Sequence, residues 1–163
     1  MKIDILTVGK VKEKFYRDAI DEYVKRMSRY AKLSIIEVAD EKTPDKASDK
    51  EVDIILKAEA DKLNRHLCSD QMQGACIITL EINGKQLSSE ELADTIDRLG
   101  KSGTSHIVFV IGGSLGLHNS ITTRADIHLS FSKMTFPHQL MRVILLEQIY
   151  RSYRIISGEP YHK

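Results

Sequence analysis

The sequence predicts an α/β fold: a mostly parallel, five-stranded sheet flanked by helices. Short apolar runs rich in Val and Ile alternate along the chain with longer stretches in which apolar residues recur every three or four positions. This alternation is typical of strands and helices in a parallel sheet. The short runs are also nearly continuous in apolar residues, as expected of strands that are covered on both faces.

The N-terminal part begins with a β-branched strand over residues 2–8, followed by a helix over 13–30. The apolar residues of that helix recur at intervals of three and four: Phe15, Ala19, Ile20, Tyr23, Val24 and Met27. A second strand covers 33–39, and a second helix covers 49–67. Ser48 stands three residues before a glutamate, which is the spacing of a helix capping box.

The middle of the chain repeats the pattern. Residues 75–82 are predicted to be a strand, residues 89–99 a helix and residues 106–111 a strand. Ser88 precedes Glu91 by three positions, again the capping-box spacing. Two polar stretches that precede this part, residues 40–49 and 69–74, are expected to be loops of a single domain that spans residues 1–163.

The C-terminal part is predicted to contain a short helix near 117–125, a strand over 127–131 and a long helix over 137–156. Pro137 suits the first turn of that helix, where a missing N–H costs nothing. The apolar residues of the helix exceed one stripe: Leu140, Met141, Val143, Ile144, Leu145, Leu146, Ile149, Tyr150, Tyr153 and Ile156. One side can cover the sheet, and a symmetric dimer through this helix is the simplest cover for the rest. A central helix buried in a monomer is the alternative, but five short strands offer little to surround it.

Composition excludes several classes of protein. Hydrophobic residues make up 42% and charged residues 29% of 163 residues, which is ordinary for a soluble globular domain. No stretch approaches the ~20 consecutive apolar residues of a membrane span, and Asp4 interrupts what would be a signal peptide. We therefore expect a cytoplasmic protein. Cys68 and Cys76 have no zinc-site or disulfide pattern, and the histidines are scattered, so no metal is expected.

The net charge of +1 argues against indiscriminate binding to nucleic acid. The charges are nevertheless unevenly distributed, because residues 10–32 and 133–163 are rich in basic side chains and residues 37–62 in acidic ones. Solvated helix faces are the commoner cause of such runs. The two basic regions are also suited to contacts with RNA phosphates.

Two loops that follow predicted strands are candidates for a ligand site. Gly112, Gly113 and Gly116 come directly after the strand 106–111, where glycine permits close approach of the backbone to a ligand. Alone, this pattern is equally compatible with a simple turn into a helix. The second loop, 131–136, places aromatic residues and a methionine around small hydroxyl side chains, which suits a flat heterocycle such as adenine. Core packing is the alternative for each aromatic residue.

Several segments closely resemble one known family. They are the opening M-K-I-x-I-L-x-V-G-K, T-L-E-I-N-G-K at 79–85, F-V-I-G-G-S-x-G-L at 109–117, L-S-F-S-K-M-T-F-P-H-Q at 129–139, M-R-V-I-L-L-E-Q-I-Y-R at 141–151 and the terminal P-Y-H-K. Together they resemble the RlmH-type rRNA methyltransferases, a branch of the SPOUT superfamily. The resemblance spans the whole chain.

The resemblance implies a C-terminal trefoil knot, one of the rare exceptions to unknotted topology, and a homodimer that uses S-adenosylmethionine. It implies methylation of N3 of a pseudouridine in large-subunit (23S) rRNA, in the assembled ribosome. The implied cofactor-binding residues lie at three strand ends: Leu80, Gly112, Phe131, Ser132, Lys133, Met134, Thr135 and Phe136. The chain leaves no residues for a separate RNA-binding domain, so the RNA would bind to the surface of the dimer.

The implied chemistry also suggests catalytic candidates. Removal of the N3 proton needs a base or a cation that stabilises the developing anion. His162 is the candidate for the first role, Arg151 for the second, and Tyr161 for stacking on the base. We expect the tail to fold over a pocket, its own or that of the partner subunit. His138 and Arg142 are further candidates, whose alternative role is to shape the last loop or to pair across the dimer.

Each catalytic candidate has an ordinary alternative. A terminal Tyr-His-Lys is usually a frayed tail, and an arginine on a helix is usually solvated or paired with an acid. Two other functions also remain open for the chain. It could be a nucleotide-binding regulatory module without catalysis, or a ribosome-assembly factor that is indifferent to the cofactor.

Overall fold

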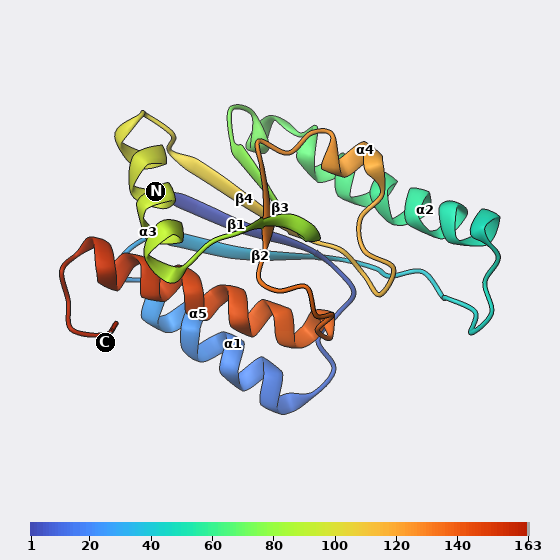
Figure 1. Cartoon of the computed structure of the whole chain (residues 1–163), viewed down its shortest axis with the longest axis horizontal. Coiled ribbons are helices and arrows are strands. Elements are labelled where there is room, and N and C mark those ends of the chain that lie inside the picture. Colours follow the sequence, from blue (N-terminus) through green and yellow to red (C-terminus); the bar gives the residue numbers. More distant parts are fainter. Residues whose placement is uncertain (163) are drawn as a thin grey trace.

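The computed structural model describes residues 1–162 and has one five-stranded sheet, in which every pairing is parallel. The strand order is β2-β1-β4-β3-β5 (Figure 1). The strands are β1 (Lys2–Val8), β2 (Lys32–Val38), β3 (Cys76–Gln86), β4 (His106–Ile111) and β5 (Ile127–Ser130). The predicted α/β class and parallel sheet are confirmed.

Helices cover both faces of the sheet (Figure 1). One face is covered by α1 (Lys14–Met27), α3 (Ser89–Lys101) and α5 (His138–Ile156), with α5 packed between the other two. The opposite face is covered by α2 (Asp49–Leu67) and the short α4 (Asn119–Thr122). A 3-10 turn, Asp70–Met72, lies within the stretch that was expected to be a loop.

The strand pattern produces two cores because successive side chains of a strand point to opposite faces. In β1, Ile3 and Ile5 enter the core beneath α1, α3 and α5, whereas Leu6 and Val8 enter the core beneath α2. In β4, Phe109 belongs to the first core, while its neighbours Val108 and Val110 belong to the second. Both faces of the central strands are therefore apolar, which explains their continuous hydrophobic runs.

The helix boundaries agree with the capping signals. Both predicted capping boxes are present: the side chains of Ser48 and Ser88 each accept a hydrogen bond from the backbone N–H of the glutamate three residues later. Pro137 precedes the first helical residue of α5 as its N-cap, with extended backbone, rather than lying inside the first turn. Its φ of −54° is the value that the proline ring imposes, but its ψ of 133° lies outside the helical region.

Strand β3 is longer than predicted, because a glycine lets it continue across β5. The register of β3 against β5 shifts so that both Leu80 and Lys85 are aligned with Leu129. A Cβ atom at Gly84 would lie 2.7 Å from the backbone carbonyl carbon of Leu129. Only glycine permits this approach, and the residues of β3 shortly before it, Leu80–Ile82, line the site described below. Within residues 1–162, no helix combines the length and apolar character that crossing a membrane requires.

Candidate functional site

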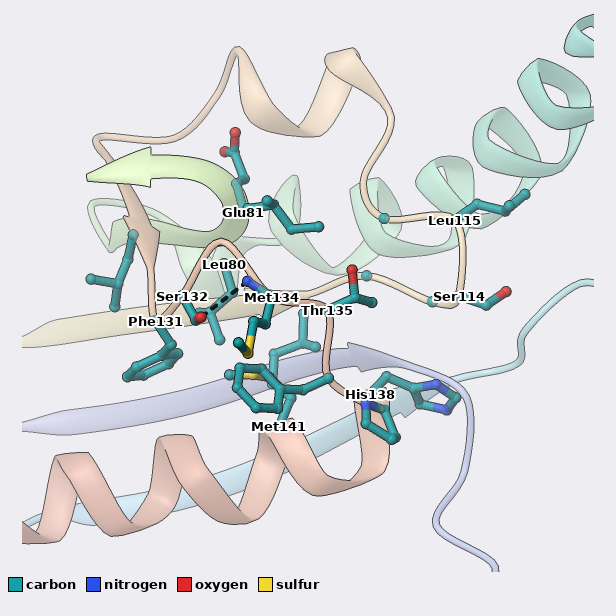
Figure 2. A pocket seen from close by; sticks show the side chains of 18 residues that line it. Leu80, Glu81, Ser114, Leu115, Phe131, Ser132, Met134, Thr135, His138 and Met141 are labelled. Atoms are coloured by element: carbon teal, nitrogen blue, oxygen red, sulfur yellow. Dashed lines mark hydrogen bonds between the residues drawn. The ribbon is translucent and has the colours of Figure 1, made fainter. Parts of the chain in front are cut away.

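A cavity of about 570 Å³ lies at the carboxyl ends of β4 and β5, beside the middle of β3. Three chain segments form its walls: Leu80–Ile82 from β3, Ile111–Gly116 after β4, and the loop from Phe131 to His138. Met141 of α5 contributes from below (Figure 2). Carboxyl ends of parallel strands are the usual place for a ligand in an α/β sheet. The two loops singled out in the sequence thus meet at one site.

The glycine loop after β4 is closed tightly on itself. Gly116 donates its N–H to the carbonyl oxygen of Gly113 at 3.1 Å and has a φ of 87°, a region that favours glycine. A Cβ atom at Gly112 would overlap the carbonyl group of Gly116, a backbone group that cannot rotate away. The loop therefore depends on glycine at both ends, and its backbone forms one wall of the cavity.

Hydroxyl groups connect the other two walls. Ser130 at the end of β5 is buried, and its hydroxyl lies 2.9 Å from the carbonyl oxygen of Ile82 and 3.1 Å from that of Ser132. The hydroxyl of Ser132 accepts a hydrogen bond from the N–H of Met134 at 3.0 Å (Figure 2). Sequence reasoning missed Ser130. The S-F-S spacing could have indicated it, since the first serine ends the strand.

The structure brings together most residues that the resemblance assigned to the cofactor. Those lining the cavity are Leu80, Gly112, Phe131, Ser132, Met134, Thr135 and Phe136. Lys133 does not line it, and its side chain is exposed. Met134 lies at the rim with 74% of its surface exposed. The cavity is thus apolar-walled, with a methionine that a bound ligand could cover.

The three catalytic candidates form a separate cluster near the end of α5. The guanidinium of Arg151 lies 4.7 Å from the ring centre of Tyr161 and donates to Glu147 at 2.6 Å. The Tyr161 hydroxyl also donates to Glu147 at 3.2 Å. His162 lies 2.7 Å from Glu90 of α3 and 3.3 Å from Arg151. The described part of the tail is therefore held by specific contacts.

None of the three candidates lines the cavity of its own chain. Arg151 stands thirteen positions after His138, which lines the cavity, and this corresponds to about 20 Å along α5 at 1.5 Å per residue. In Figure 1 the C-terminus likewise lies at the opposite end of α5 from the loop that precedes this helix. The expectation that the tail folds over a pocket does not hold for the chain's own cavity.

The surroundings of Arg151 and Tyr161 raise the pKa values of both side chains. The hydrogen bond from Arg151 to Glu147 is the main cause that raises the pKa of Arg151. Burial raises the pKa of the Tyr161 hydroxyl, and the nearby Glu147 carboxylate raises it further. Tyr161 therefore stays protonated and Arg151 charged at neutral pH. Neither is suited to accept a proton, whereas the imidazole of His162 is chemically able to do so.

The two further candidates, His138 and Arg142, differ in their surroundings. His138 lines the cavity, and burial followed by the charge of Arg142 lowers its pKa. Arg142 is fully buried and donates to the carbonyl oxygens of Val8 at 3.0 Å and Gly9 at 2.6 Å. Arg142 also forms an ion pair with Glu37 at 3.2 Å, so its side chain is held by contacts within its own chain, and it does not itself line the cavity.

A buried carboxyl group that the sequence did not indicate lies behind the glycine loop. Glu59 of α2 is 4% exposed, and its Oε1 accepts the N–H of Glu41 at 3.0 Å. Its Oε2 has no hydrogen-bond partner among the described residues and would lie 3.0 Å from a Cβ atom at Gly113. Burial, reinforced by the charge of Asp40, raises the pKa of Glu59 against the opposing effects of the Glu41 N–H and Lys62.

We expect Glu59 to make stability fall as the pH rises. Because its pKa is raised in the folded protein, the folded state holds the proton more tightly than the unfolded state, and raising the pH above the ordinary value of 4.5 favours unfolding. The Glu59→Gln variant keeps an acceptor for the Glu41 N–H and cannot ionise. Urea denaturation between acidic and neutral pH should therefore show a smaller loss of stability in the variant, and equal losses would contradict the assignment.

Among residues 1–162, no group of three or more His, Cys, Asp or Glu side chains is arranged to hold a metal ion. The two cysteines are both free, Cys68 exposed and Cys76 buried. Burial raises the pKa of Cys76 to about 11, so its thiol is not a nucleophile near neutral pH.

This chain matches a known protein family over almost its whole length. A family described as "Predicted SPOUT methyltransferase" matches residues 1–162. A protein of Bifidobacterium adolescentis named ribosomal RNA large subunit methyltransferase H is 62% identical over 163 residues, and one of Clostridium beijerinckii with the same name is 55% identical. Both alignments cover 100% of this chain and 100% of the relative.

Solved structures share the fold at low sequence identity. The tRNA (m1G37) methyltransferase of Aquifex aeolicus superimposes with a TM-score of 0.56 at 11% identity, covering 100% of this chain and 75% of that one. A Legionella pneumophila protein described as a "putative methyltransferase", solved in complex with the bound cofactor SAM, superimposes with a TM-score of 0.50 at 8% identity, covering 93% of this chain and 66% of that one. At these identities the likeness concerns the fold alone.

Proposed function

Because this chain belongs to the SPOUT methyltransferase family, we propose that it transfers a methyl group from S-adenosylmethionine to N3 of a pseudouridine in large-subunit rRNA. The full-length relatives that are 55–62% identical carry the name ribosomal RNA large subunit methyltransferase H. We further propose that the substrate is the assembled ribosome, which would place the enzyme in the cytoplasm. The cavity at the ends of β4 and β5, beside the middle of β3, is the observation that carries this proposal.

The cavity has the size and chemistry to hold the cofactor. A volume of about 570 Å³ lies within the usual range for small-molecule sites. Its apolar walls, which include Leu80, Phe131 and Phe136, suit the adenine ring. The glycine loop brings backbone polar groups to the cavity without an intervening side chain. We propose that these segments hold the cofactor, with the Lys133 side chain outside the pocket.

The cofactor supplies an electrophilic methyl group on a sulfonium. The acceptor nitrogen must lose a proton and must be held in line with that methyl group. We propose that His162 accepts the proton and that Arg151 stabilises the negative charge that develops on the uracil ring. Tyr161 would stack on the base, since its ring is already oriented by Arg151 and Glu147.

A dimer would bring these groups to the cavity. A stripe of half-exposed residues runs along α5: Leu140, Val143, Ile144, Glu147, Gln148 and Arg151. If two copies of this stripe pack antiparallel about a two-fold axis, Arg151 of one helix lies opposite Leu140 of the other. Leu140 adjoins Met141, which lines the cavity. We propose a homodimer in which each tail completes the partner's pocket.

The family also supports a proposal about chain topology. SPOUT enzymes thread the C-terminal part of the chain through itself as a trefoil knot. We propose that the segment from β5 through the 131–136 loop is threaded in this way, because the same segments form the cavity. Such a knot would fix the two loops with little conformational freedom, so the pocket would be largely preformed.

The proposed reaction can be tested by incubating the protein with methyl-labelled S-adenosylmethionine and ribosomes from a strain that lacks this enzyme. We expect label in large-subunit rRNA at one pseudouridine, in mapping by mass spectrometry. Two outcomes would favour the alternatives. Thermal stabilisation by the cofactor without methyl incorporation indicates a nucleotide-binding module, and ribosome binding that is indifferent to the cofactor indicates an assembly factor.

A further inference from the structure

The start of α1 exposes a phenylalanine on a basic surface. Phe15 is 64% exposed, although it is one of the large hydrophobic residues of the chain, and its ring centre lies 4.2 Å from that of Tyr16. The only acidic residue between positions 10 and 17 is Glu13. The basic side chains of this segment are all exposed: Lys10, Lys12, Lys14 and Arg17. An aromatic ring surrounded by cations suits a nucleic acid, whose bases stack and whose phosphates pair with lysine.

Most of these charges are available to a partner. Lys14 is paired with Asp18 at 2.6 Å. By contrast, no carboxylate among residues 1–162 lies within ion-pair distance of Lys10, Lys12 or Arg17. Unpaired exposed cations of this kind can neutralise phosphates and release their counterions.

The basic segment is fastened to the cavity wall. Arg142 donates to the carbonyl oxygen of Gly9, and the backbone N–H of Lys12 donates to Gln139 of α5 at 3.4 Å. A Cβ atom at Gly9 would lie 3.0 Å from the ring of His138, which lines the cavity. In Figure 2 the connection from β1 to α1 passes beside His138. A surface held in this way keeps a constant position relative to the pocket.

We propose that Phe15, with Lys10, Lys12 and Arg17, is a docking surface for an unpaired nucleotide of the rRNA next to the target base. This proposal rests on the proposed function and names how that substrate is recognised. The ring stacks on an exposed base, while the three cations contact the flanking phosphates. The surface positions the RNA and takes no part in the chemical step.

The proposal is tested by measuring the affinity of the protein and its variants for ribosomes that lack the modification. Binding is measured first without methyl transfer and then in methylation assays. Phe15→Ala and Phe15→Leu should weaken ribosome binding by about 5- to 150-fold, equivalent to ~1–3 kcal/mol for one lost stacking contact. In methylation assays the half-saturating ribosome concentration should rise by a similar factor with little change in the maximal rate. Phe15→Trp should bind at least as well as the wild type. Lys12→Ala should reduce the salt dependence of log K by about 1.

Matched controls separate this role from other causes. Ile54 on α2 is 58% exposed, and Ile54→Ala should leave ribosome binding unchanged. Calorimetry with S-adenosylmethionine should give the same affinity for wild type and Phe15→Ala. Wild-type binding by Phe15→Leu would overturn the proposal, and so would a loss of dimer in light scattering, which would make Phe15 a contact between copies. Binding assays need no turnover, so a failure of the methylation reaction would not be confused with a failure of this surface.

Discussion

Replacing Gly112 by alanine is expected to abolish measurable cofactor binding, with at least a 100-fold loss of affinity. The added Cβ atom would overlap the carbonyl group of Gly116, so the loop between them has to open. This loop forms a wall of the cavity, and a 100-fold loss of affinity corresponds to about 2.8 kcal/mol of lost contacts with the cofactor. Isothermal titration calorimetry with S-adenosylmethionine measures the loss directly. Overpacking should also destabilise the fold by ~1–3 kcal/mol.

A second glycine provides the matched control for this substitution. Gly100 lies in α3, and a Cβ atom there would meet only the end of the Met1 side chain at 3.5 Å. Gly100→Ala should therefore bind the cofactor normally and gain ~0.5–1 kcal/mol of stability from helix propensity. Wild-type cofactor affinity in a folded Gly112→Ala variant would rule out the glycine loop as part of the binding site.

Replacing His162 by alanine is expected to leave cofactor affinity nearly intact while methylation slows by ~100- to 10,000-fold, the usual contribution of one general base. His162 lies outside the cavity of its own chain, and among residues 1–162 its ring nitrogens contact only Glu90 and Arg151. Single-turnover assays with labelled cofactor and saturating ribosomes measure the chemical step. Unchanged turnover would remove His162 from the mechanism.

The same variants test whether the tail acts on the partner's pocket. Subunits carrying Gly112→Ala are mixed with subunits carrying His162→Ala, after unfolding and refolding together. If each tail serves the partner, half of the refolded dimers contain one intact site, and about one quarter of the wild-type rate should return. If each tail serves its own chain, every site carries a defect. If mass spectrometry shows that mixed dimers have formed and methylation activity still does not return, the proposed arrangement is contradicted.

Local sequence signals predicted the elements well. Apolar periodicity identified all five strands, and the serine-to-glutamate spacings identified the starts of α2 and α3 correctly. The end of β3 was missed because Gly84 reads as a turn signal. Its actual role is to let the strand pass close to Leu129, which is a contact between distant parts of the chain.

The candidate site was only partly predictable. The two loops were recognisable because glycines and a compact aromatic segment follow strands, and parallel strands bring such ends together. Lys133 was included because it lies within a matching motif, and motif position does not specify which way a side chain points. Glu59 and Ser130 were not predicted as part of the site, because an acid on a helix and a serine at a strand end are usually exposed and the sequence does not show that these two are buried.

The sequence by itself determined the parallel sheet, its two apolar faces and the loops that line the cavity, because each depends on the spacing of residues that are neighbours in the chain. Only the tertiary structure decided that Arg142 is buried beneath Gly9, that Glu59 lies behind the glycine loop and that Arg151 and His162 lie far from their own cavity. These arrangements arise from packing between elements distant in sequence. No local periodicity encodes which side chains such packing will bring together or separate.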